Sequence, residues 1–535
     1  MEVRILFKKD AQQVMFEGIN ELAEAVSATL GPKGHSVILD KGYGIPHVTK
    51  DGVTVARAYD TDDPMKRMGA TLAKTVAAKT CDEAGDGTTT ATILTRALIK
   101  KGMDRMGKIK NPQKFREGME YAVRTAVEFI GKHAKKIEET EFDRVHQIAT
   151  ISANGDDEIG TIITEAIGKV GNDGVITVEE ASGDTETTVE VTTGFQWDKG
   201  LLNPYFVTDP ERIECVLEKP YVLLIGQNIN YPAEILQVVQ SVYSEKRALL
   251  IVAPNASNDV LNFLVTNITG NGHLKACFVK APGYGQIQKD MLEDLAAKIG
   301  ASTVGDEYGR PMNQMGMDWL GQCDRVVVSS NKTILVGGAG TEEAVSQRVE
   351  SIRHQMKENN NAFDIEKYRE RISRLTGGAA VVYVGANSDV EMKERKDRVD
   401  DAIAATRAAL EEGYVPGGGT VQLRIAENLD FWNQTLRGSS PDFLEGIAVV
   451  REAVMAPFEQ LCENCSVNAK KIAKALRNEA FEVGYNPLEE KVVNMYEAGI
   501  IDPAKVTRVS LENSVSVAIQ FLNTSCAISA QEEKK

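Results

Sequence analysis

The sequence lacks features that would place the protein in several common classes. No apolar run reaches the roughly 20 residues that a membrane-spanning helix needs, so we expect no membrane span. Positive charge is not in excess, because the formal net charge is −16 and the pI is near 5.1. An acidic chain repels nucleic acid and anionic lipid, so neither is expected as the main partner.

The opening residues lack the apolar segment and small-residue cleavage site of a secretory signal peptide. They read MEVRILFKKDAQQVMFEG, with charged residues at several positions. On this ground we expect a cytoplasmic protein, in a bacterial-type or a host-cell cytoplasm.

Cysteine and histidine are sparse, with seven and six copies in 535 residues. An odd, scattered set of cysteines is not a disulfide framework. Cys462 and Cys465 form one CxxC motif, which is a weak metal signal without a second pair and is more often structural. The histidines show no ligand spacing, so a zinc site is not expected. The remaining cysteines are Cys81, Cys215, Cys277, Cys323 and Cys526.

The motif G-x-x-x-x-G-K-[ST] is also absent, which excludes a P-loop nucleotide site. The length, in contrast, is sufficient for about three or four domains, and 42% hydrophobic residues are sufficient for large cores. Both ends of the chain read as helical, with apolar residues at helical spacing in 65–80, 112–131 and 400–412.

The middle of the chain reads as mixed. Apolar or alternating runs predict strands, and helix-sized segments between the later ones predict βαβ units with parallel pairing. The run 325–338 predicts a hairpin that turns near Ser330–Asn331, and 341–375 predicts two amphipathic helices that pack on each other. Gly194 and Gly377–Gly378 mark the two ends of an inserted domain. The predicted strands are 174–180, 187–194, 221–226, 248–253 and 275–282.

The stretch AGDGTTTAT (84–92) places an aspartate between two glycines at the start of a predicted helix. The first N–H groups of a helix and its macrodipole attract anions, so threonine hydroxyls and exposed amides there favour phosphate. Asp86 beside a phosphate needs an intervening cation, which indicates Mg²⁺. The alternative is that Thr88 simply caps the helix.

Other glycine-rich turns lie far away in sequence. They are TLGPKG (29–34), TKDGVTVAR (49–57) and VPGGGTV (415–421), in which three glycines open a helix. Asp401 is expected to start a helix of its own. Each piece alone is more often only a turn.

Together these pieces fall in the order of one family. The chain resembles the group I chaperonins of the GroEL type from about residue 10 to residue 526, and GDGTTTAT with TLGPKG is the most specific part of the match. The further matching segments are ISAN, VGNDGVITVEE, NPYF, KAPGYG, RLTGGAAVVYVGA, EMKERKDRVDDAIAATRAALEEG, PGGGT, GYNP and GIIDPAKVTR.

The resemblance implies a multi-domain fold that combines all-α and α/β parts in a ring-forming subunit. A helical, discontinuous equatorial domain that binds ATP is expected at 1–132 and 410–527. A small intermediate hinge domain is expected at 133–192 and 379–409, and an α/β apical domain that binds clients at 193–378. Residues 528–535 are expected to be a disordered tail.

The resemblance also implies the nucleotide site. Asp86 would hold Mg²⁺, the carbonyls of Thr29 and Lys50 would share a K⁺, and Asp401 and Asp51 would position and activate the attacking water. Gly418 would approach the ribose and base, and Asp502 would accept the ribose hydroxyls. The phosphate contacts would be Gly87, Thr88, Thr89 and Thr90; the nucleotide would be covered by Thr29, Leu30, Gly31 and Pro32; the base would be lined by Asn486, Pro487, Leu488 and Ile500.

The implied partners are non-native proteins, further copies of the chain in a seven-subunit ring, and a co-chaperonin lid. Two predicted helices, 233–243 and 257–268, are more apolar than one core-facing stripe requires, which favours an exposed apolar groove between them. Leu201 replaces a usual tyrosine and Thr266 a usual valine. The implied client surface comprises Leu201, Tyr205, Phe206, Leu236, Val239, Leu261, Val265 and Thr266.

Two rival functions are a metabolic kinase and a passive holdase without ATP hydrolysis. The sequence has no acceptor-site signature, and it carries the three aspartates of the implied site. Some positions depart from the family. Glu138 stands where a hinge proline is usual, and Glu459 replaces an arginine at the ring–ring contact, so single rings are an alternative. Asp156 and Arg398 are expected to pair between neighbouring subunits, as are Lys199 and Asp389.

Overall fold

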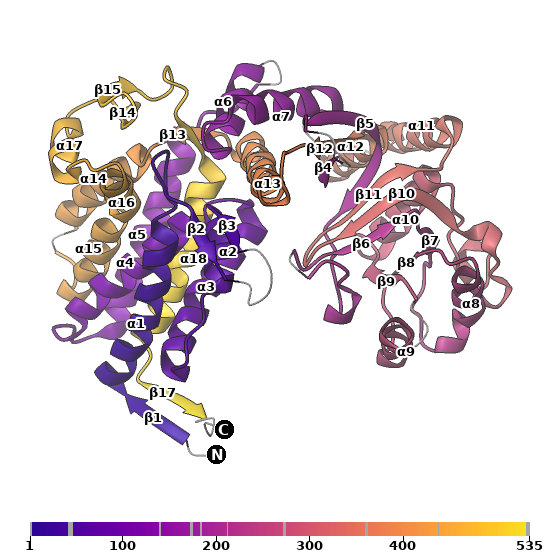
Figure 1. Ribbon diagram of the computed structural model, residues 1–535, viewed down its shortest axis with the longest axis horizontal. Coiled ribbons are helices and arrows are strands. Elements are labelled where there is room, and N and C mark those ends of the chain that lie inside the picture. Colours follow the sequence, from indigo (N-terminus) through magenta and orange to yellow (C-terminus); the bar gives the residue numbers. More distant parts are fainter. Residues whose placement is uncertain are drawn as a thin grey trace. The chain divides into compact units, whose positions relative to one another are not determined.

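A computed structural model describes residues 3–40, 46–138, 141–171, 175–181, 185–210, 212–270, 274–358, 362–436 and 438–530. The chain divides into two compact units. The helical unit contains Met1–Thr164, Glu180–Thr187 and Val384–Lys535, and the mixed unit contains Glu165–Glu179 and Thr188–Tyr383. Figure 1 shows the indigo and yellow ends of the chain together in the helical unit. The inserted segment 193–378 falls inside the mixed unit.

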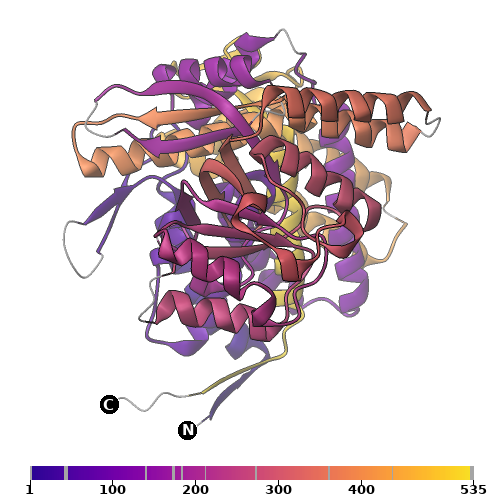
Figure 2. The same ribbon diagram turned by 90° about the vertical axis from the view of Figure 1, so that its right-hand side faces the viewer.

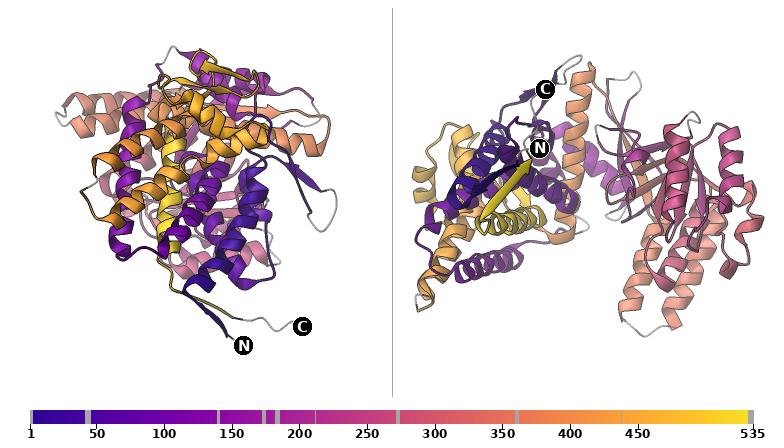
Figure 3. Two further views of the ribbon diagram at one scale, coloured as in Figure 1. Left: turned by 90° about the vertical axis from the view of Figure 1, so that its left-hand side faces the viewer. Right: turned by 90° about the horizontal axis from the view of Figure 1, so that it is seen from below.

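The helical unit consists mainly of long helices (Figure 3). Its largest apolar cluster includes Leu22, Leu98, Met119, Ile447 and Phe521. Its helices are α1 (Lys8–Ser27), α2 (Gly52–Ala58), α3 (Pro64–Ala84), α4 (Thr88–Met106), α5 (Pro112–His133), α6 (Phe142–Ser152), α13 (Asp389–Glu412), α14 (Thr420–Thr435), α15 (Pro441–Ala453), α16 (Ala456–Asn464), α17 (Ala469–Leu476) and α18 (Ala504–Leu522), while α7 (Asp157–Val170) spans the division between the units.

Local chemistry fixes where these helices begin and end. Asp63 caps α3 by accepting a hydrogen bond from the Met65 amide at 2.8 Å, and Pro64 occupies the first turn, where a missing N–H costs nothing. Asn111 and Pro112 repeat this arrangement at α5. The predicted helices at 65–80 and 112–131 are therefore confirmed. Asp401, in contrast, does not start a helix, because α13 begins at Asp389 behind the Ser388 cap.

Small two-stranded sheets connect the helices of this unit. Residues 528–530 were expected in a disordered tail, but they form part of β17, where Ile528 lies opposite Ile5 of β1. The extended backbone of β17 satisfies its hydrogen bonds on β1; residues 531–535 lie outside the described residues. The paired strands are β1 (Val3–Phe7) with β17 (Cys526–Ala530), β2 (Val37–Leu39) with β3 (His47–Thr49), β13 (Tyr414–Pro416) with β16 (Ile501–Pro503), and β14 (Val483–Asn486) with β15 (Lys491–Asn494).

Within the described residues, the mixed unit contains a nine-stranded sheet of order β4-β12-β5-β11-β10-β7-β8-β9, with β6 also paired to β10. Strands β7, β8 and β9 are parallel, as the βαβ pattern predicts. The hairpin prediction is also confirmed, because β10 and β11 pair up to Val328 opposite Thr333. The strands are β4 (Val175–Glu180), β5 (Thr188–Trp197), β6 (Cys215–Glu218), β7 (Tyr221–Leu224), β8 (Leu249–Ala253), β9 (Ala276–Lys280), β10 (Gly321–Val328), β11 (Thr333–Gly338) and β12 (Gly378–Val384).

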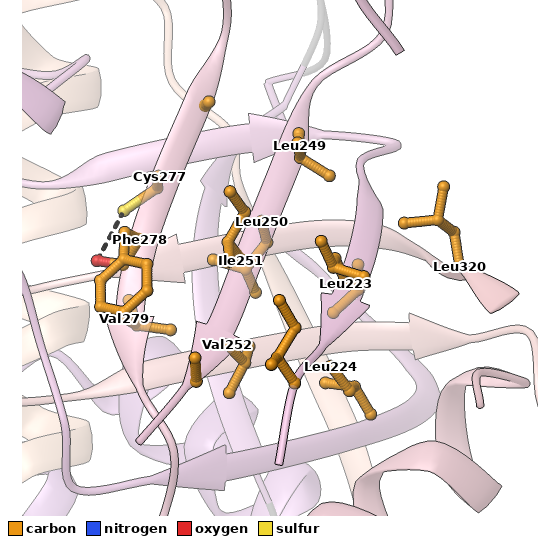
Figure 4. Packing of buried hydrophobic residues seen from close by; sticks show 14 of the residues in the cluster. Leu223, Leu224, Leu249, Leu250, Ile251, Val252, Cys277, Phe278, Val279 and Leu320 are labelled. Atoms are coloured by element: carbon orange, nitrogen blue, oxygen red, sulfur yellow. Dashed lines mark hydrogen bonds between the residues drawn. The ribbon is translucent and has the colours of Figure 1, made fainter. Parts of the chain in front are cut away.

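The parallel strands form the centre of this unit's core. Figure 4 shows Leu223, Ile251 and Phe278 on three neighbouring strands, and all three are fully buried. The continuous apolar runs that predicted these strands are typical of a sheet covered on both faces. The helices are α8 (Leu236–Ser244), α9 (Asn258–Thr269), α10 (Gly285–Ile299), α11 (Glu342–Glu358) and α12 (Ala362–Thr376), with short 3-10 turns η1 (Pro204–Phe206), η2 (Pro232–Glu234), η3 (Asp306–Tyr308), η4 (Met312–Gln314) and η5 (Met317–Trp319).

Helices α11 and α12 lie side by side, as Figures 2 and 3 show. Val349, Ile352 and Leu375 are buried between them, and Val345 and Ile372 pack against this cluster. The prediction of two mutually packed amphipathic helices is thus confirmed.

Candidate functional site

The loop between α3 and α4 explains the unusual AGDGTTT sequence. Gly85 and Gly87 are both left-handed, with φ of 71° and 86°. A Cβ on Gly85 would lie 2.3 Å from the Cβ of Ala404, and one on Gly87 would lie 2.6 Å from Cγ1 of Val506. Glycine is therefore required at both positions by conformation and by space.

The helix α4 begins without a side-chain cap. Its N-cap is Gly87, and Thr88 is the first helical residue, so the alternative that Thr88 caps the helix is wrong. The first amides of a helix have no partner within it, and the N-cap Gly87 has no side chain that could accept from them. The amides of Thr88–Thr90 thus form an available anion site at the positive end of the helix dipole.

Asp51 lies directly beside these threonines. A Cβ on its neighbour Gly52 would be 2.2 Å from Oγ1 of Thr89. Asp51 caps α2: its Oδ1 accepts from the Val53 amide at 2.9 Å, and its Oδ2 accepts from the Thr54 amide and hydroxyl at 2.8 and 2.6 Å. These bonds hold the Asp51 carboxylate in one orientation. Its oxygens can accept further hydrogen bonds.

Asp401 reaches the same place from the middle of α13. Burial raises the pKa of its carboxyl well above 3.8, and the neighbouring charges of Asp51 and Asp86 raise the pKa further. Burial also raises the pKa of Asp86, while the Gly87 amide, which donates to its Oδ1, opposes this. Desolvated carboxyls that repel one another favour a cation between them.

The chemistry of these groups fits Mg²⁺ held jointly with phosphate. Among the described residues, no three His, Cys, Asp or Glu side chains converge closely enough to hold a metal by themselves. Mg²⁺ commonly uses one or two carboxylates and takes its other ligands from phosphate and water. The predicted absence of a zinc site remains a prediction.

A second part of the site gathers around Gly418. A Cβ on Gly417 would lie 2.7 Å from Oδ1 of Asp502, and one on Gly418 would lie 3.6 Å from Cγ2 of Ile500. Val415 and Asp502 are paired across β13 and β16. Burial, followed by the charge of Asp86, raises the pKa of Asp502 to about 7. Asp502 therefore lies against the Gly418 loop and close enough to the Asp86 loop for its pKa to depend on the charge of Asp86.

The segment after α1 is held by α16. The Nδ2 of Asn464 donates to the carbonyls of Ser27 and Leu30, each at 2.9 Å, and Thr29 is buried. Gly31 has a left-handed φ of 83°. On the base side, Asn486 is buried and its Oδ1 accepts from the Leu488 amide at 3.0 Å. Leu488 itself is 63% exposed.

Sequence reasoning missed several residues that shape this site. Thr54 orients Asp51, Ala404 packs on Gly85, and Asn464 holds the Thr29 segment. Ser510 donates to the Gly87 carbonyl at 3.3 Å from α18. Only the position of Thr54, three residues after a helix-capping aspartate, could have been inferred from sequence, because the others come from distant helices.

The second predicted site lies on α8, α9 and η1 of the mixed unit. Tyr205, Leu236 and Thr266 are exposed, and Leu201, Leu261 and Val265 are partly buried against the core. Phe206 and Val239 are 1% and 5% exposed, so their prediction as surface residues is wrong. Both side chains belong to the unit's core.

Two exposed tyrosines near the same helices were not predicted. Tyr231 is 68% exposed beside η2, and Tyr243 is 48% exposed on α8. Tyrosine is compatible with solvent and with an apolar partner, and its sequence context gave no signal of exposure. Exposed apolar and aromatic side chains thus accompany two helices that already have a buried face, as the groove prediction requires.

Asp156 and Arg398 were predicted to pair between subunits, but the structure pairs them within one chain. Nη1 of Arg398 lies 3.0 Å from Oδ2 of Asp156. The reason is that α13 and α6 pack against each other in the helical unit, which brings Asp156, in the turn between α6 and α7, alongside α13.

These features define a chaperonin-type subunit, and comparison with known proteins agrees. The model of the TCP-1/cpn60 chaperonin family matches residues 22–532, so the chain belongs to this family. Two crystal forms of the chaperonin gp146 from the Pseudomonas aeruginosa bacteriophage EL 2 have the same fold. Each is 22% identical and is covered over 99% of both chains, with TM-scores of 0.71 and 0.64.

The family assignment supports a chaperone function and confirms the predicted fold class. Among the described residues, no helix combines the length and the apolar character needed to cross a bilayer.

Proposed function

We propose that the protein is an ATP-dependent molecular chaperone that binds non-native proteins and promotes their folding in a ring chamber. The observation that carries this proposal is the convergence of Asp51, Asp86 and Asp401 beside the uncapped start of α4. Chaperonin gp146 was crystallised in the presence of ATP-BeFx, which supports nucleotide binding at the equivalent fold.

In the proposed site, Asp86 holds Mg²⁺, and the amides and hydroxyls of Thr88–Thr90 bind phosphate oxygens. When bound, the magnesium ion neutralises charge on the phosphates. Asp401 has a raised carboxyl pKa. Its carboxylate accepts the proton that the attacking water loses. Asp51, held by Thr54, orients that water. Positioning and charge neutralisation are the main requirements of phosphoryl transfer.

The remaining nucleotide contacts are proposed from the same assembly. Asp502 accepts the ribose hydroxyls beside Gly418, and Asn486, Pro487, Leu488 and Ile500 line the base. Thr29–Pro32 would cover the nucleotide, and the carbonyls of Thr29 and Lys50 would hold a K⁺. Asp401 lies on α13 and Asp86 on another segment, so hydrolysis requires α13 to remain packed on the α3–α4 loop.

Ring assembly is supported by two ribbons, β1 with β17 and β2 with β3, each of which has two strands among the described residues. Ile5, Phe7 and Ile528 are 46%, 63% and 60% exposed on β1 and β17, and Ile38 is 69% exposed on β2. An isolated two-stranded ribbon is only marginally stable, and its free edges are templates for another chain. We propose that these ribbons pair between neighbouring copies in a seven-subunit ring, with a co-chaperonin as a lid.

The alternative is a chaperonin that works as single rings or without a co-chaperonin. Glu459 is exposed on α16, and no carboxylate follows Cys465 in the next turn, which ends at Asn468. The segment 459–468 thus lacks the arginine and the acidic turn that the resemblance associates with the contact between two rings. Native mass spectrometry in apo, ATP and ADP conditions separates the two assemblies by their mass.

Client binding is tested by substitutions on the exposed groove. Leu236→Ser should reduce suppression of aggregation of a denatured client severalfold, while ATP turnover without client stays at the wild-type rate. The matched control is Gln237→Ser, which changes an exposed polar neighbour on α8. Equal suppression by Leu236→Ser and wild type would remove α8 from the client surface.

A further inference from the structure

The mixed unit contains a pocket of about 780 Å³ that the proposed ATPase and client surfaces do not use. It lies where β10 changes partner. Strand β10 pairs with β6 from Arg325 onward and with β7 through Gly321 and Gln322. Between these two pairings, the turn at Lys219 faces Asp324, whose carbonyl accepts from the Lys219 amide at 2.7 Å. The change of partner leaves room between strands.

Four basic side chains line this pocket, against two acidic ones, Glu218 and Asp324. Lys219 precedes β7, Lys246 and Arg247 precede β8, and Lys275 precedes β9. Because β7, β8 and β9 are parallel neighbours, the turns before them meet at one edge of the sheet. The basic charge therefore comes from three separate turns and is a product of the fold.

Arg247 lines the pocket and is held in place by contacts with its neighbours. Its Nε donates to the Lys219 carbonyl at 3.0 Å, its Nη1 donates to Oε1 of Gln322 at 3.1 Å, and its guanidinium lies 4.0 Å from the Tyr221 ring centroid. The three lysines differ from it. Within the described part of the chain, none of their ammonium groups has a carboxylate partner, and all three lysines are exposed.

Two of these lysines occupy left-handed backbone positions. Lys219 has φ of 44° and Lys246 has φ of 56°. Lys246 follows Glu245, the C-cap of α8, where glycine is the usual residue. At both turns the chain carries an ammonium group on a residue whose conformation favours glycine. Strain of this kind is most common at functional sites.

We propose that this pocket binds a small anion with two or more phosphate groups. The volume is in the range of small-molecule sites, about 300–1,000 Å³. Lysine binds phosphate as a point charge, and ammonium groups on three turns suit several phosphates better than one. The lining keeps an excess of two positive charges over Asp324 and Glu218, so it attracts a multiply charged anion more strongly than a singly charged one. An acidic peptide is the competing occupant that the test must distinguish.

The test is isothermal titration calorimetry of tripolyphosphate into the full chain at low ionic strength. The wild type should bind one tripolyphosphate per chain in this pocket, besides any bound at the Thr88–Thr90 amides, and only the pocket binding should change in the pocket variants. The double variant Lys219→Gly/Lys246→Gly should bind about tenfold more weakly, since two exposed charges of up to about fivefold each give at most about 25-fold. Glycine suits the left-handed backbone, so the double variant should fold.

Lys275→Gln provides a second variant that does not depend on backbone conformation, with about threefold weaker binding expected. Lys289→Ala, which removes a partly exposed lysine on α10 that pairs with Glu307 outside the pocket, is the control and should bind as the wild type does. The proposal is overturned if the wild type does not bind, or if the double variant binds equally. It is also overturned if a glutamate-rich peptide binds more tightly than tripolyphosphate and loses that binding in the double variant.

Discussion

Ala404 on α13 lies against Gly85 at the end of α3, so closely that a Cβ on Gly85 would stand 2.3 Å from the Ala404 Cβ. This contact joins the helix that carries Asp401 to the loop that carries Asp86. It makes the geometry of the candidate ATPase site depend on the packing of one helix on one glycine.

Gly85→Ala should therefore reduce both stability and activity. A non-glycine residue in the left-handed region costs about 1–2 kcal/mol, and the clash with Ala404 displaces α13. We expect ATP turnover to fall more than tenfold, measured by phosphate release, with a lower unfolding temperature. Gly131→Ala on α5 is the control, since nothing lies within 4 Å of a Cβ there.

Asp401→Ala should bind ATP but hydrolyse it at least about 100-fold more slowly, the usual scale for loss of a general base. Equilibrium binding of a fluorescent ATP analogue and single-turnover hydrolysis measure the two properties separately. Asp400→Asn, the neighbouring carboxyl, is the control and should remain within a few-fold of wild type. Normal single-turnover hydrolysis by Asp401→Ala would refute the role of Asp401.

Asp502 should make the stability of the nucleotide-free chain depend on pH. Its pKa is raised from 3.8 to about 7 in the folded chain, so the folded state holds a proton that the unfolded state has released. Stability contributed by this group is present below about pH 4 and is lost as pH rises to about 7, with a slope of at most about 1.4 kcal/mol per pH unit. Urea titrations at several pH values measure it.

The matched variant is Asp502→Asn, which cannot release a proton and should flatten that part of the profile. An unchanged profile in Asp502→Asn would assign the dependence to another group. The same substitution should weaken ATP binding, because an amide is a poorer acceptor for ribose hydroxyls than a carboxylate.

Arg398→Ala should loosen α13 only slightly. Its pair with Asp156 is partly exposed, with 23% and 24% of the two side chains accessible, so the expected cost is about 1 kcal/mol or less. We expect up to about a threefold change in steady-state ATP turnover. Arg116→Ala, which removes a more exposed pair with Glu120, should change neither turnover nor stability measurably. Identical turnover in both variants would show that the pair of Arg398 with Asp156 does not affect hydrolysis.

Sequence patterns predicted the helices and strands better than they predicted which residues contact one another. The parallel strands were predictable because their continuous apolar runs reflect burial on both faces, and the 325–338 hairpin because its turn interrupts two such runs. The pairing of Asp156 with Arg398 inside one chain was not predicted, because charge at a position does not reveal whether its partner lies in the same chain. A pair between subunits stays a prediction. Phe206 and Val239 are buried by tertiary packing. The apolar character of a residue and its near neighbours in sequence does not show whether its side chain is buried or exposed.

The loops of the candidate site were predictable from the sequence, but the residues that hold these loops in place were not. The pair of glycines around Asp86 is readable, because left-handed turns demand glycine. Asn464 and Ala404 approach from helices hundreds of residues away from the loops that they contact. Glu138 shows the limit of comparison by residue type: its amide donates to Oε2 of Glu141 at 3.0 Å, a bond that the expected proline could not make.

The central claim is that ATP hydrolysis by the helical unit drives folding of non-native proteins. The most direct measurement is the yield of refolded, active client enzyme after dilution from denaturant, with the full chain and either ATP or a non-hydrolysable analogue, in the presence of Mg²⁺ and K⁺. We predict that ATP raises the yield severalfold with the wild type, and that neither the analogue nor the Asp401→Ala variant does so. Equal yields with and without hydrolysis, while the protein still binds the client, would contradict the account and identify a passive holdase.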